Sequence, residues 1–298
     1  DVGNTDTYWK VLVQGTPENR LSDRGDLLTY TTEKTALTIG TPGTIIKSSG
    51  TAASWGNFGL TTNVYFVSVQ GKDTAGSGFT DNAPFRTVKY ACDYILADEA
   101  ARAPATIYIK TGIYEEILPI TIPATVALVG DELRSTVIQA ASGYETSNMF
   151  YVRNGTGIRN MTLQGLSGTL AAENVYGTRR PTAGAYVSLD SGTGGDDTNV
   201  WIQTKSPYIQ NVTTFGTGCI GLKIDGNLHN GGNKSVVAND FTQVLNDGIG
   251  VWVDGNGVSE LVSVFTYFCH IGYLATIGGK VRATNGNNSY GTFGSVAE

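Results

Sequence analysis

Two aspartates in the C-terminal half carry side chains of the kind that hydrolyse glycosidic bonds. Asp240 and Asp247 bracket a strand-like segment, and the aromatic residues Trp252 and Tyr267 follow it. Glycoside hydrolases use two carboxyl groups about 5–9.5 Å apart, and aromatic rings stack on sugar rings. Asp240 and Asp247 are therefore candidates for catalysis, and Trp252 and Tyr267 for glycan binding. The sequence spacing alone does not place the two carboxyls at the required distance.

A second candidate for ligand contact is a long insertion at residues 167–206. It contains Arg179 and Arg180 and a Gly-rich run at 191–195. Insertions into the coils of a repeat protein project from one flank, which is commonly the binding flank. We therefore expect Arg179 and Arg180 to contact a ligand.

Three asparagines, Asn160, Asn211 and Asn239, occupy what reads as one position in successive coils. One interpretation is a sugar-binding row. The interpretation we prefer is a structural ladder, in which stacked amides bond to each other and to the turn backbone. Asp225 and Asp254 are also equivalent to each other, but each precedes a glycine, so we interpret them as turn residues rather than as a catalytic pair.

The sequence carries no pattern typical of a metal or cofactor site. The two histidines, His229 and His270, are far apart, and His270 and its neighbour Cys269 would point to opposite faces of a strand. The acidic loop at 190–197 lacks the spacing of an EF-hand. We expect no metal, no cofactor and no Ser-His-Asp triad.

The composition indicates a β-rich protein that binds neither nucleic acid nor a membrane. The 298 residues include 39 glycines and only 15% are charged, which favours many short strands joined by tight turns. A net charge of −6 does not suit a phosphate backbone, and no run reaches the roughly 20 apolar residues that span a bilayer. The separate cysteines Cys92, Cys219 and Cys269 are expected in the core.

An internal repeat is the strongest signal for the fold. The segment IGLKIDG at 220–226 returns as IGVWVDG at 249–255 and in shorter form at 271–274, at spacings of 29 and 22 residues. A second series, which carries the three asparagines, lies ahead of these segments. A period in the twenties with at least two strands per coil predicts a right-handed parallel β-helix, in which equivalent side chains stack from coil to coil.

The repeat divides the chain into three regions. Residues 1–60 have too few apolar clusters to bury a core alone, and we expect an extended arm for attachment or oligomerisation. Residues 61–104 contain a strand and an amphipathic helix, capped by Asp81, that covers the open end of the coils. Residues 105–298 form the β-helix, and we expect the chain to continue beyond residue 298.

Part of the first region resembles a segment of phage proteins. The stretches GDLL at 25–28, IGTPGTII at 39–46 and ASWG at 53–56 are similar to the "GDLL … IGTxGQVL … xPxWG" segment of tail-fibre and other virion proteins. Thr44 stands where that segment has Gln, and the Pro before Trp is absent. The resemblance implies a part of a bacteriophage particle.

Residues 83–139 resemble the first coils of pectin methylesterases and other pectin-lyase-like proteins. A helix there precedes a pattern similar to "IYVKxGxYxExV…I…LxGD…TxI". The resemblance implies the fold of those proteins. Their catalytic "GxxDFIFG"-type motif has its nearest approach in NDFTQ at 239–243, which matches neither its order nor its surroundings, so no catalytic residue carries over.

Together these features predict an all-β, pectin-lyase-like parallel β-helix from a phage virion. We expect a fibre-like or receptor-engaging component of the tail or particle surface, which forms a homotrimer, contacts other virion proteins and meets a host surface glycan. The alternative is a tailspike that degrades capsule or lipopolysaccharide, as a polysaccharide hydrolase or lyase. The site decides between these functions, because fold alone does not.

Overall fold

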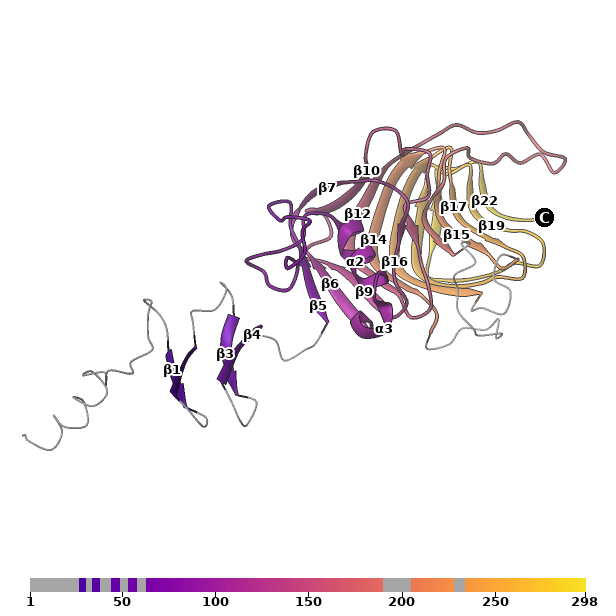
Figure 1. The fold of residues 1–298 in the computed structure, drawn as a ribbon. Helices are drawn as coiled ribbons and strands as arrows, with labels where there is room; N and C mark the ends of the chain where they lie inside the picture. Colours follow the sequence, from indigo (N-terminus) through magenta and orange to yellow (C-terminus); the bar gives the residue numbers. More distant parts are fainter. Residues whose placement is uncertain are drawn as a thin grey trace, which may run out of the picture. The chain divides into compact units, whose positions relative to one another are not determined.

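The chain forms two units, residues 1–60 and 61–298. Within the predicted arm, β1 (Leu27–Tyr30) pairs antiparallel with β2 (Lys34–Leu37), and β3 (Thr44–Ser48) pairs antiparallel with β4 (Ala53–Asn57) (Figure 1). The structure is a computed structural model that describes residues 27–30, 34–37, 44–48, 53–57, 63–189, 205–227 and 234–298.

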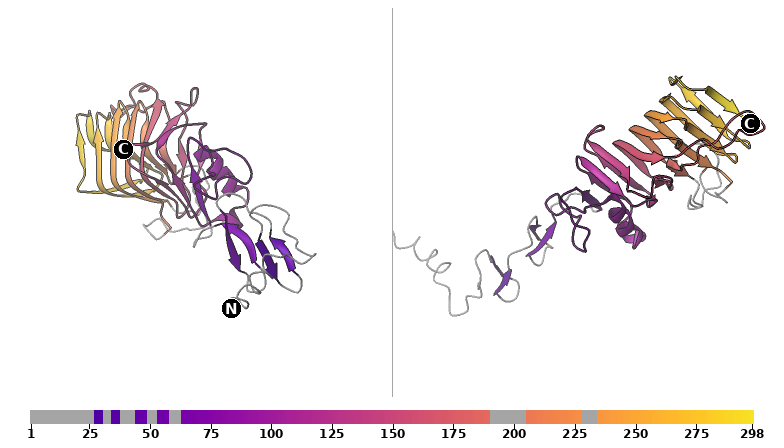
Figure 2. Two further views of the ribbon diagram at one scale, coloured as in Figure 1. Left: turned by 90° about the vertical axis from the view of Figure 1, so that its left-hand side faces the viewer. Right: turned by 90° about the horizontal axis from the view of Figure 1, so that it is seen from above.

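The second unit is a parallel β-helix, as predicted, whose coils stack from its N-terminal to its C-terminal end (Figure 2). Each coil has three limbs. The first and second limbs join in an 11-stranded sheet and the third limbs form a 7-stranded sheet. Every pairing in the two sheets between β6 and β22 is parallel, which requires the chain to return to the same side once per coil.

The first two coils have separate strands for each limb, and most later coils merge the first two limbs into one long bent strand. The separate strands are β6 (Ala105–Ile109), β7 (Gly112–Glu116), β8 (Ile120–Thr121), β9 (Val126–Gly130), β10 (Thr136–Ala140) and β11 (Phe150–Tyr151). The long strands are β12 (Gly157–Ser167), β14 (Tyr208–Thr217), β16 (Ser235–Asn246) and β18 (Val258–Tyr267). The third limbs that follow are β13 (Ala185–Leu189), β15 (Ile220–Asp225), β17 (Ile249–Asp254) and β19 (Ile271–Ala275). The last coil consists of β20 (Lys280–Thr284), β21 (Asn287–Ser289) and β22 (Phe293–Ala297).

Equivalent residues of the sequence repeat pair with each other in the 7-stranded sheet. Ile220 pairs with Ile249, and Ile249 pairs with Ile271. These isoleucines lie in an apolar cluster separate from the main core, whereas Leu222 and Val251, two residues further on, lie in the main core. The glycine between them therefore sits where the strand changes which face points inward.

The glycine of the repeat is required by the side chains that face it inside the β-helix. A Cβ on Gly221 would lie 1.5 Å from Oε1 of Gln243, and a Cβ on Gly250 would lie 2.4 Å from Cγ2 of Thr266. Gln243 and Thr266 are buried and pair with each other in the 11-stranded sheet. The repeated Ile-Gly pair thus encodes an isoleucine that is buried in the second cluster and a gap for a polar side chain inside the β-helix.

A helix covers the N-terminal end of the coils, as predicted, although it begins later than expected. The helix α2 (Val88–Leu96) is capped by Thr87, whose side chain accepts a hydrogen bond from the backbone N–H of Tyr90. Asp81, the predicted cap, instead forms an ion pair with Lys110 at 3.0 Å. The short helix α3 (Glu99–Arg102) follows α2, and β5 (Val64–Val67) pairs with β6. The helix residues buried against the coils are Val88, Ala91, Cys92 and Ile95.

The prediction that residues 167–206 form one continuous insertion was wrong. The five residues of β13 inside it are all buried and form a third limb, paired with β11 and β15. The run AYVSL lacks the Ile-Gly signature, because Tyr186 fills the interior where later coils have glycine, so the repeat did not reveal it. The loop 168–184 remains as the described part of the insertion, and residues 190–204 lie outside the described residues.

The three cysteines are free and buried, as expected of core residues. Burial raises the pKa of Cys219 and of Cys269 to about 12, so both thiols stay protonated near neutral pH. In the described part of the chain, neither helix has the length and apolar character to cross a bilayer.

Candidate functional site

One row of outward-facing side chains runs through the second limb of every coil. Because the strands pair in register, each coil contributes one residue to the row at a spacing of about 4.8 Å. The row begins beside the capping helix with carboxylate and amide groups and continues with two aromatic rings. Its members in coil order are Glu115, Gln139, Gln164, Phe215, Val244, Tyr267 and Ser289.

Hydrogen bonds fix the first three members of the row. Nε2 of Gln139 donates to Oε1 of Glu115 at 3.1 Å, and Nε2 of Gln164 donates to Oε1 of Gln139 at 2.9 Å. Each amide nitrogen carries a second N–H that these bonds do not use. The three polar groups are therefore held in place on the surface, with hydrogen-bonding capacity still directed outward.

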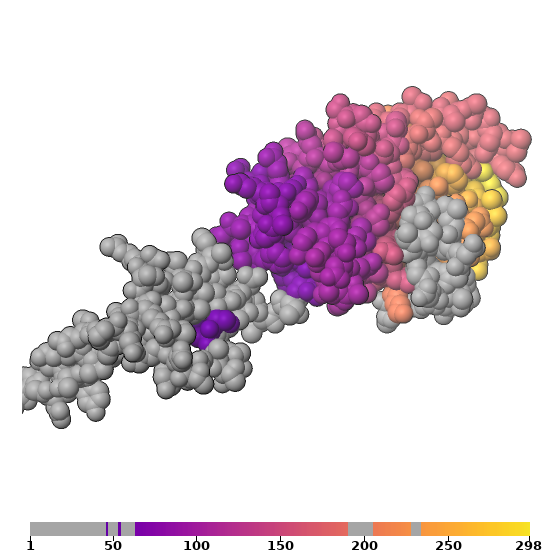
Figure 3. Space-filling view, in the orientation of Figure 1, coloured from indigo at the N-terminus to yellow at the C-terminus, as the bar shows by residue number. Residues whose placement is uncertain are grey.

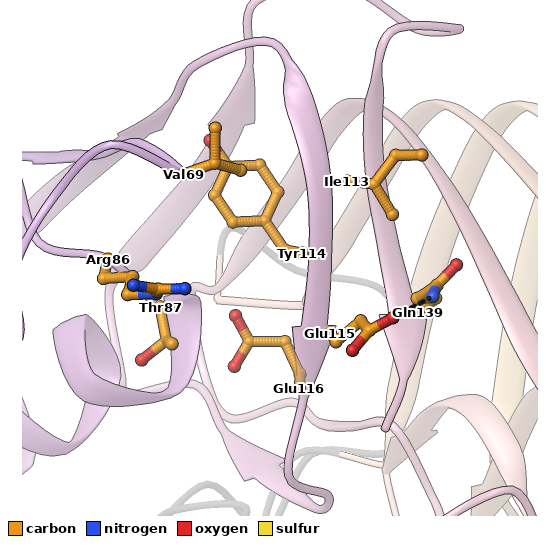
Figure 4. A pocket seen from close by; sticks show the side chains of 8 residues that line it. All are labelled: Val69, Arg86, Thr87, Ile113, Tyr114, Glu115, Glu116 and Gln139. Atoms are coloured by element: carbon orange, nitrogen blue, oxygen red, sulfur yellow. Dashed lines mark hydrogen bonds between the residues drawn. The ribbon is translucent and has the colours of Figure 1, made fainter. Parts of the chain in front are cut away.

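The first hollow beside this row lies at the capping-helix end. Its volume is about 500 Å³. Figure 4 shows Glu115 and Gln139 side by side on one flank, with Glu116 between β7 and the start of α2. The lining residues are Val69, Arg86, Thr87, Ile113, Tyr114, Glu115, Glu116 and Gln139.

Glu116 resembles an active-site acid but holds the capping helix in place. Its carboxyl accepts the backbone N–H groups of Val88 at 2.6 Å and Lys89 at 3.1 Å, which lie in the first turn of α2. Burial raises the pKa of Glu116 to about 7, and the two N–H bonds oppose that shift. Both oxygens bind the helix N-terminus, where a carboxylate satisfies unpaired N–H groups, so the role of Glu116 is structural.

The second hollow shares Gln139 with the first and extends along the later coils. Its volume is about 570 Å³, and Glu145, Gln164, Phe215 and Asn246 contribute to its lining. The ring of Phe215 is 40% exposed. We call the two hollows together the outer groove. It combines an exposed ring with fixed amides and carboxylates, groups that can stack on a ring and form hydrogen bonds with hydroxyl groups.

The structure separates the candidate catalytic aspartates. Asp240 lies at the bend of β16, and Asp247 follows the end of that strand at the next corner. Seven residues of extended chain span on the order of 20 Å. This is more than the separation of about 5–9.5 Å that glycoside hydrolases use, so Asp240 and Asp247 cannot act as a pair.

The candidate aromatics also lie apart. Tyr267 belongs to the outward row, two coils beyond Phe215. Trp252 lies on β17 in the other sheet, where its Nε1 donates to Oγ1 of Thr276 at 2.9 Å. The structure therefore places Tyr267 on the face of the outer groove and Trp252 on a different face.

The two arginines predicted to contact a ligand lie where the loop 168–184 meets the C-terminal coils. The backbone N–H of Arg179 donates to Nε2 of His270 at 3.1 Å. Arg180 forms an ion pair with Glu298, and its guanidinium lies 5.2 Å from the ring centre of Trp252. The loop lies near the yellow atoms of the C-terminal residues (Figure 3). Arg180 and Trp252 are thus engaged with each other within the fold.

The asparagine ladder is present but has a different third member. Asn160 and Asn211 both have positive φ, and Nδ2 of Asn211 donates to Oδ1 of Asn160 at 3.1 Å. Asn239 pairs with Gln210, so its prediction as a ladder residue was wrong by one position. Asp240 occupies the left-handed bend there, with φ of 50°. Aspartate replaces asparagine because both tolerate this conformation.

The remaining candidates have local roles or lie outside the described residues. Oδ1 of Asp225 accepts the N–H of Asn227 at 3.0 Å, and Oδ1 of Asp254 accepts the N–H of Gly255 at 2.8 Å, as turn residues do. His229 and the acidic loop at 190–197 fall outside the described residues. Within the described ranges, no three His, Cys, Asp or Glu side chains cluster as metal ligands would.

Coils of parallel strands behind a capping helix define a parallel β-helix protein. The chain belongs to the family described as "Protein of unknown function (DUF1565)", whose model matches residues 69–293. No curated protein sequence matched the chain.

Solved structures with a similar course of the chain include two pectin methylesterases and a viral protein. Pectin methylesterase PemA from Erwinia chrysanthemi is 14% identical, with a TM-score of 0.37 over 79% of this chain and 81% of that one. A pectin methylesterase in complex with a hexasaccharide is 15% identical, with a TM-score of 0.34 over 76% and 68%. Geobacillus virus E2 ORF18 is 12% identical, with a TM-score of 0.18 over 78% and 62%. None of them lends a residue role to this chain.

Most of the outer groove was not predicted from the sequence. Glu115, Gln139, Gln164 and Phe215 share no motif, and the loops between them differ in length. The detectable signal was strand alternation, which places all four outward. Only the register of β7, β10, β12 and β14 shows that they form one row.

Proposed function

We propose that the protein is a bacteriophage virion component whose β-helix binds a host surface glycan in the outer groove without cleaving it. The observation that carries the proposal is the in-register row of fixed polar groups and an exposed ring from Glu115 to Phe215. The similarity of residues 25–56 to a segment of tail-fibre proteins supports a place in the virion.

The hydrogen bonds made by the acidic side chains of the groove support binding without cleavage. Glu116 is committed to the capping helix, and Glu115 accepts a bond from Gln139. Glu145 accepts the backbone N–H of Gly143 at 2.8 Å. Among the described residues that line the groove, these are the acids, and each is tied to a structural partner.

In this proposal, residues 1–60 mediate attachment and trimer formation. A two-stranded hairpin is marginally stable in water by itself, and β1–β2 and β3–β4 are both two-stranded. A partner surface supplied by other virion proteins, or by two further copies of the chain, stabilises such hairpins. The protein then sits on the tail or on the particle surface as a homotrimer.

Three measurements test the proposal. Light scattering over a range of concentrations should give three times the chain mass, and antibodies to residues 105–298 should label intact particles. A host capsule or lipopolysaccharide that the protein binds should release no new reducing ends in a reducing-end assay. A monomer that labels no particle contradicts the virion role, and release of reducing ends identifies a depolymerase instead.

A further inference from the structure

We propose that the outer groove selects an uncharged polysaccharide, which lies along the β-helix axis, and discriminates against acidic chains such as uronic acid polymers. This inference rests on the glycan-binding function proposed above and adds the class of glycan. It follows from the charge of the groove, the chemistry of its exposed groups and the direction of the row.

The groove is acidic along its length. Glu115 and Glu116 line the first hollow, and Glu145 lines the second. Among the described lining residues, Arg86 is the cationic one, and it belongs to the capping-helix end only. Like charges within a few ångströms repel even near a protein surface, so a chain with a carboxylate on every sugar meets repulsion over most of the groove.

The exposed groups suit neutral sugars. The Gln139 and Gln164 side chains both donate and accept hydrogen bonds, as sugar hydroxyls do, and the hydrogen bonds between them fix their positions. Phe215 follows Gln164 in register and offers a ring for the apolar face of a sugar. The contacts available are therefore uncharged ones.

The row sets the direction of the ligand. Glu115, Gln139, Gln164 and Phe215 lie on four successive coils, so three strand intervals of about 4.8 Å give a path of about 14 Å along the axis. Both hollows follow this line and share Gln139. An extended chain of a few sugar rings fits along the row better than one sugar in a closed pocket.

The test is an array of bacterial surface polysaccharides, sorted by charge and probed with the full chain. We expect binding to uncharged members to exceed binding to acidic members by at least tenfold, with at least a tenfold loss in Phe215→Ala. A double variant, Glu115→Gln with Glu145→Gln, should gain at least tenfold for the acidic members. Glu260→Gln removes an acid from β18, outside the groove lining, and should give no such gain.

The outcomes separate this inference from the proposed function. Preferential binding to acidic members overturns the charge selection and leaves glycan binding intact. Equal binding of Phe215→Ala and wild type to uncharged members overturns the groove as their site. Binding to no member overturns glycan recognition altogether. Each variant is compared with wild type by circular dichroism and thermal unfolding, so that misfolding is recognised as such.

Discussion

The backbone N–H of Arg179 donates to Nε2 of His270 at 3.1 Å, which ties the loop 168–184 to the start of β19. His270 is 8% exposed, and Nε2 accepts the bond only while the ring is neutral. Burial lowers the pKa of His270, and the nearby Arg179 and Arg180 lower it further, while Asp247 and Glu173 oppose them. The contact between loop and coil is therefore sensitive to pH.

Wild-type stability should fall on acidification relative to His270→Gln. The folded state favours neutral His270, so the unfolded chain binds more protons once the pH drops below about 6.5. His270 thus contributes its full stability above that pH, and the contribution is lost as the pH falls. Urea unfolding at pH 7.5 and 5.5 measures the effect. If the difference in unfolding free energy between wild type and His270→Gln is the same at both pH values, the role of His270 is contradicted.

The stability of His270→Gln must be subtracted from that of wild type, because the contribution of Glu116 to stability changes with pH in the opposite direction. Its folded pKa of about 7 lies above that of a free carboxyl, so protonation of Glu116 stabilises the fold as the pH drops. That contribution is common to wild type and His270→Gln and cancels. Burial raises the pKa of Glu298, but its bonds with Thr178 and Arg180 lower this pKa on balance, so Glu298 loses its contribution only in more acidic solution.

Removal of the Arg180 guanidinium should release the loop 168–184. Its partner Glu298 has a side chain only 6% exposed, so Arg180→Ala leaves a largely buried carboxylate without its ion pair. We expect a loss of about 1–3 kcal/mol and faster hydrogen exchange in the loop and in β19. The control is Arg282→Ala, whose arginine side chain is 70% exposed in its pair with Glu260 and should cost less than about 1 kcal/mol. Equal effects of the two variants would refute the role of the loop contact.

Asn211→Ala should cost far more stability than Asn239→Ala. Asn211 has φ of 52° and donates to Asn160, so alanine loses the bond and adopts a left-handed conformation at a cost of about 1–2 kcal/mol. Asn239 lies at a paired strand position, where we expect a change within about 0.5 kcal/mol. Chemical denaturation of both variants decides the matter, and the reverse order would place Asn239 in the ladder after all.

Gly250→Ala should destabilise the coils by about 1–3 kcal/mol through overpacking. The added Cβ would lie 2.4 Å from Cγ2 of Thr266 and 2.5 Å from the carbonyl oxygen of Gly272. Gly157→Ala is the matched control, because its Cβ meets nothing closer than 3.5 Å. Urea midpoints compare the two, and a neutral Gly250→Ala would show that the interior has room for the extra carbon.

The sequence predicted the coils well because their signal is local. The Ile-Gly pairs at 220 and 249 fixed the register of the 7-stranded sheet, since each glycine makes room for an interior side chain. The bend of the long strands was harder to predict from the sequence, because the residue with positive φ is asparagine in two coils and Asp240 in the next. A one-residue shift in the alignment therefore moved the ladder from Asp240 to Asn239.

The site was harder to predict because its residues are brought together by stacking of distant segments. Gln139 and Phe215 share a groove although 76 residues separate them in the chain. Arg180 and Trp252, both candidates for binding, lie against each other, with the guanidinium 5.2 Å from the ring centre. Composition and spacing do not carry this information, because loop lengths between coils vary.

Calorimetric titration of the full chain with an uncharged polysaccharide selected from the array tests glycan binding through the outer groove most directly. Binding through the groove predicts a measurable Kd for wild type, at least tenfold weaker binding for Phe215→Ala, and unchanged binding for Asp240→Asn with Asp247→Asn, with no new reducing ends. Unchanged affinity in Phe215→Ala, or cleavage abolished by the two aspartate substitutions, would contradict it.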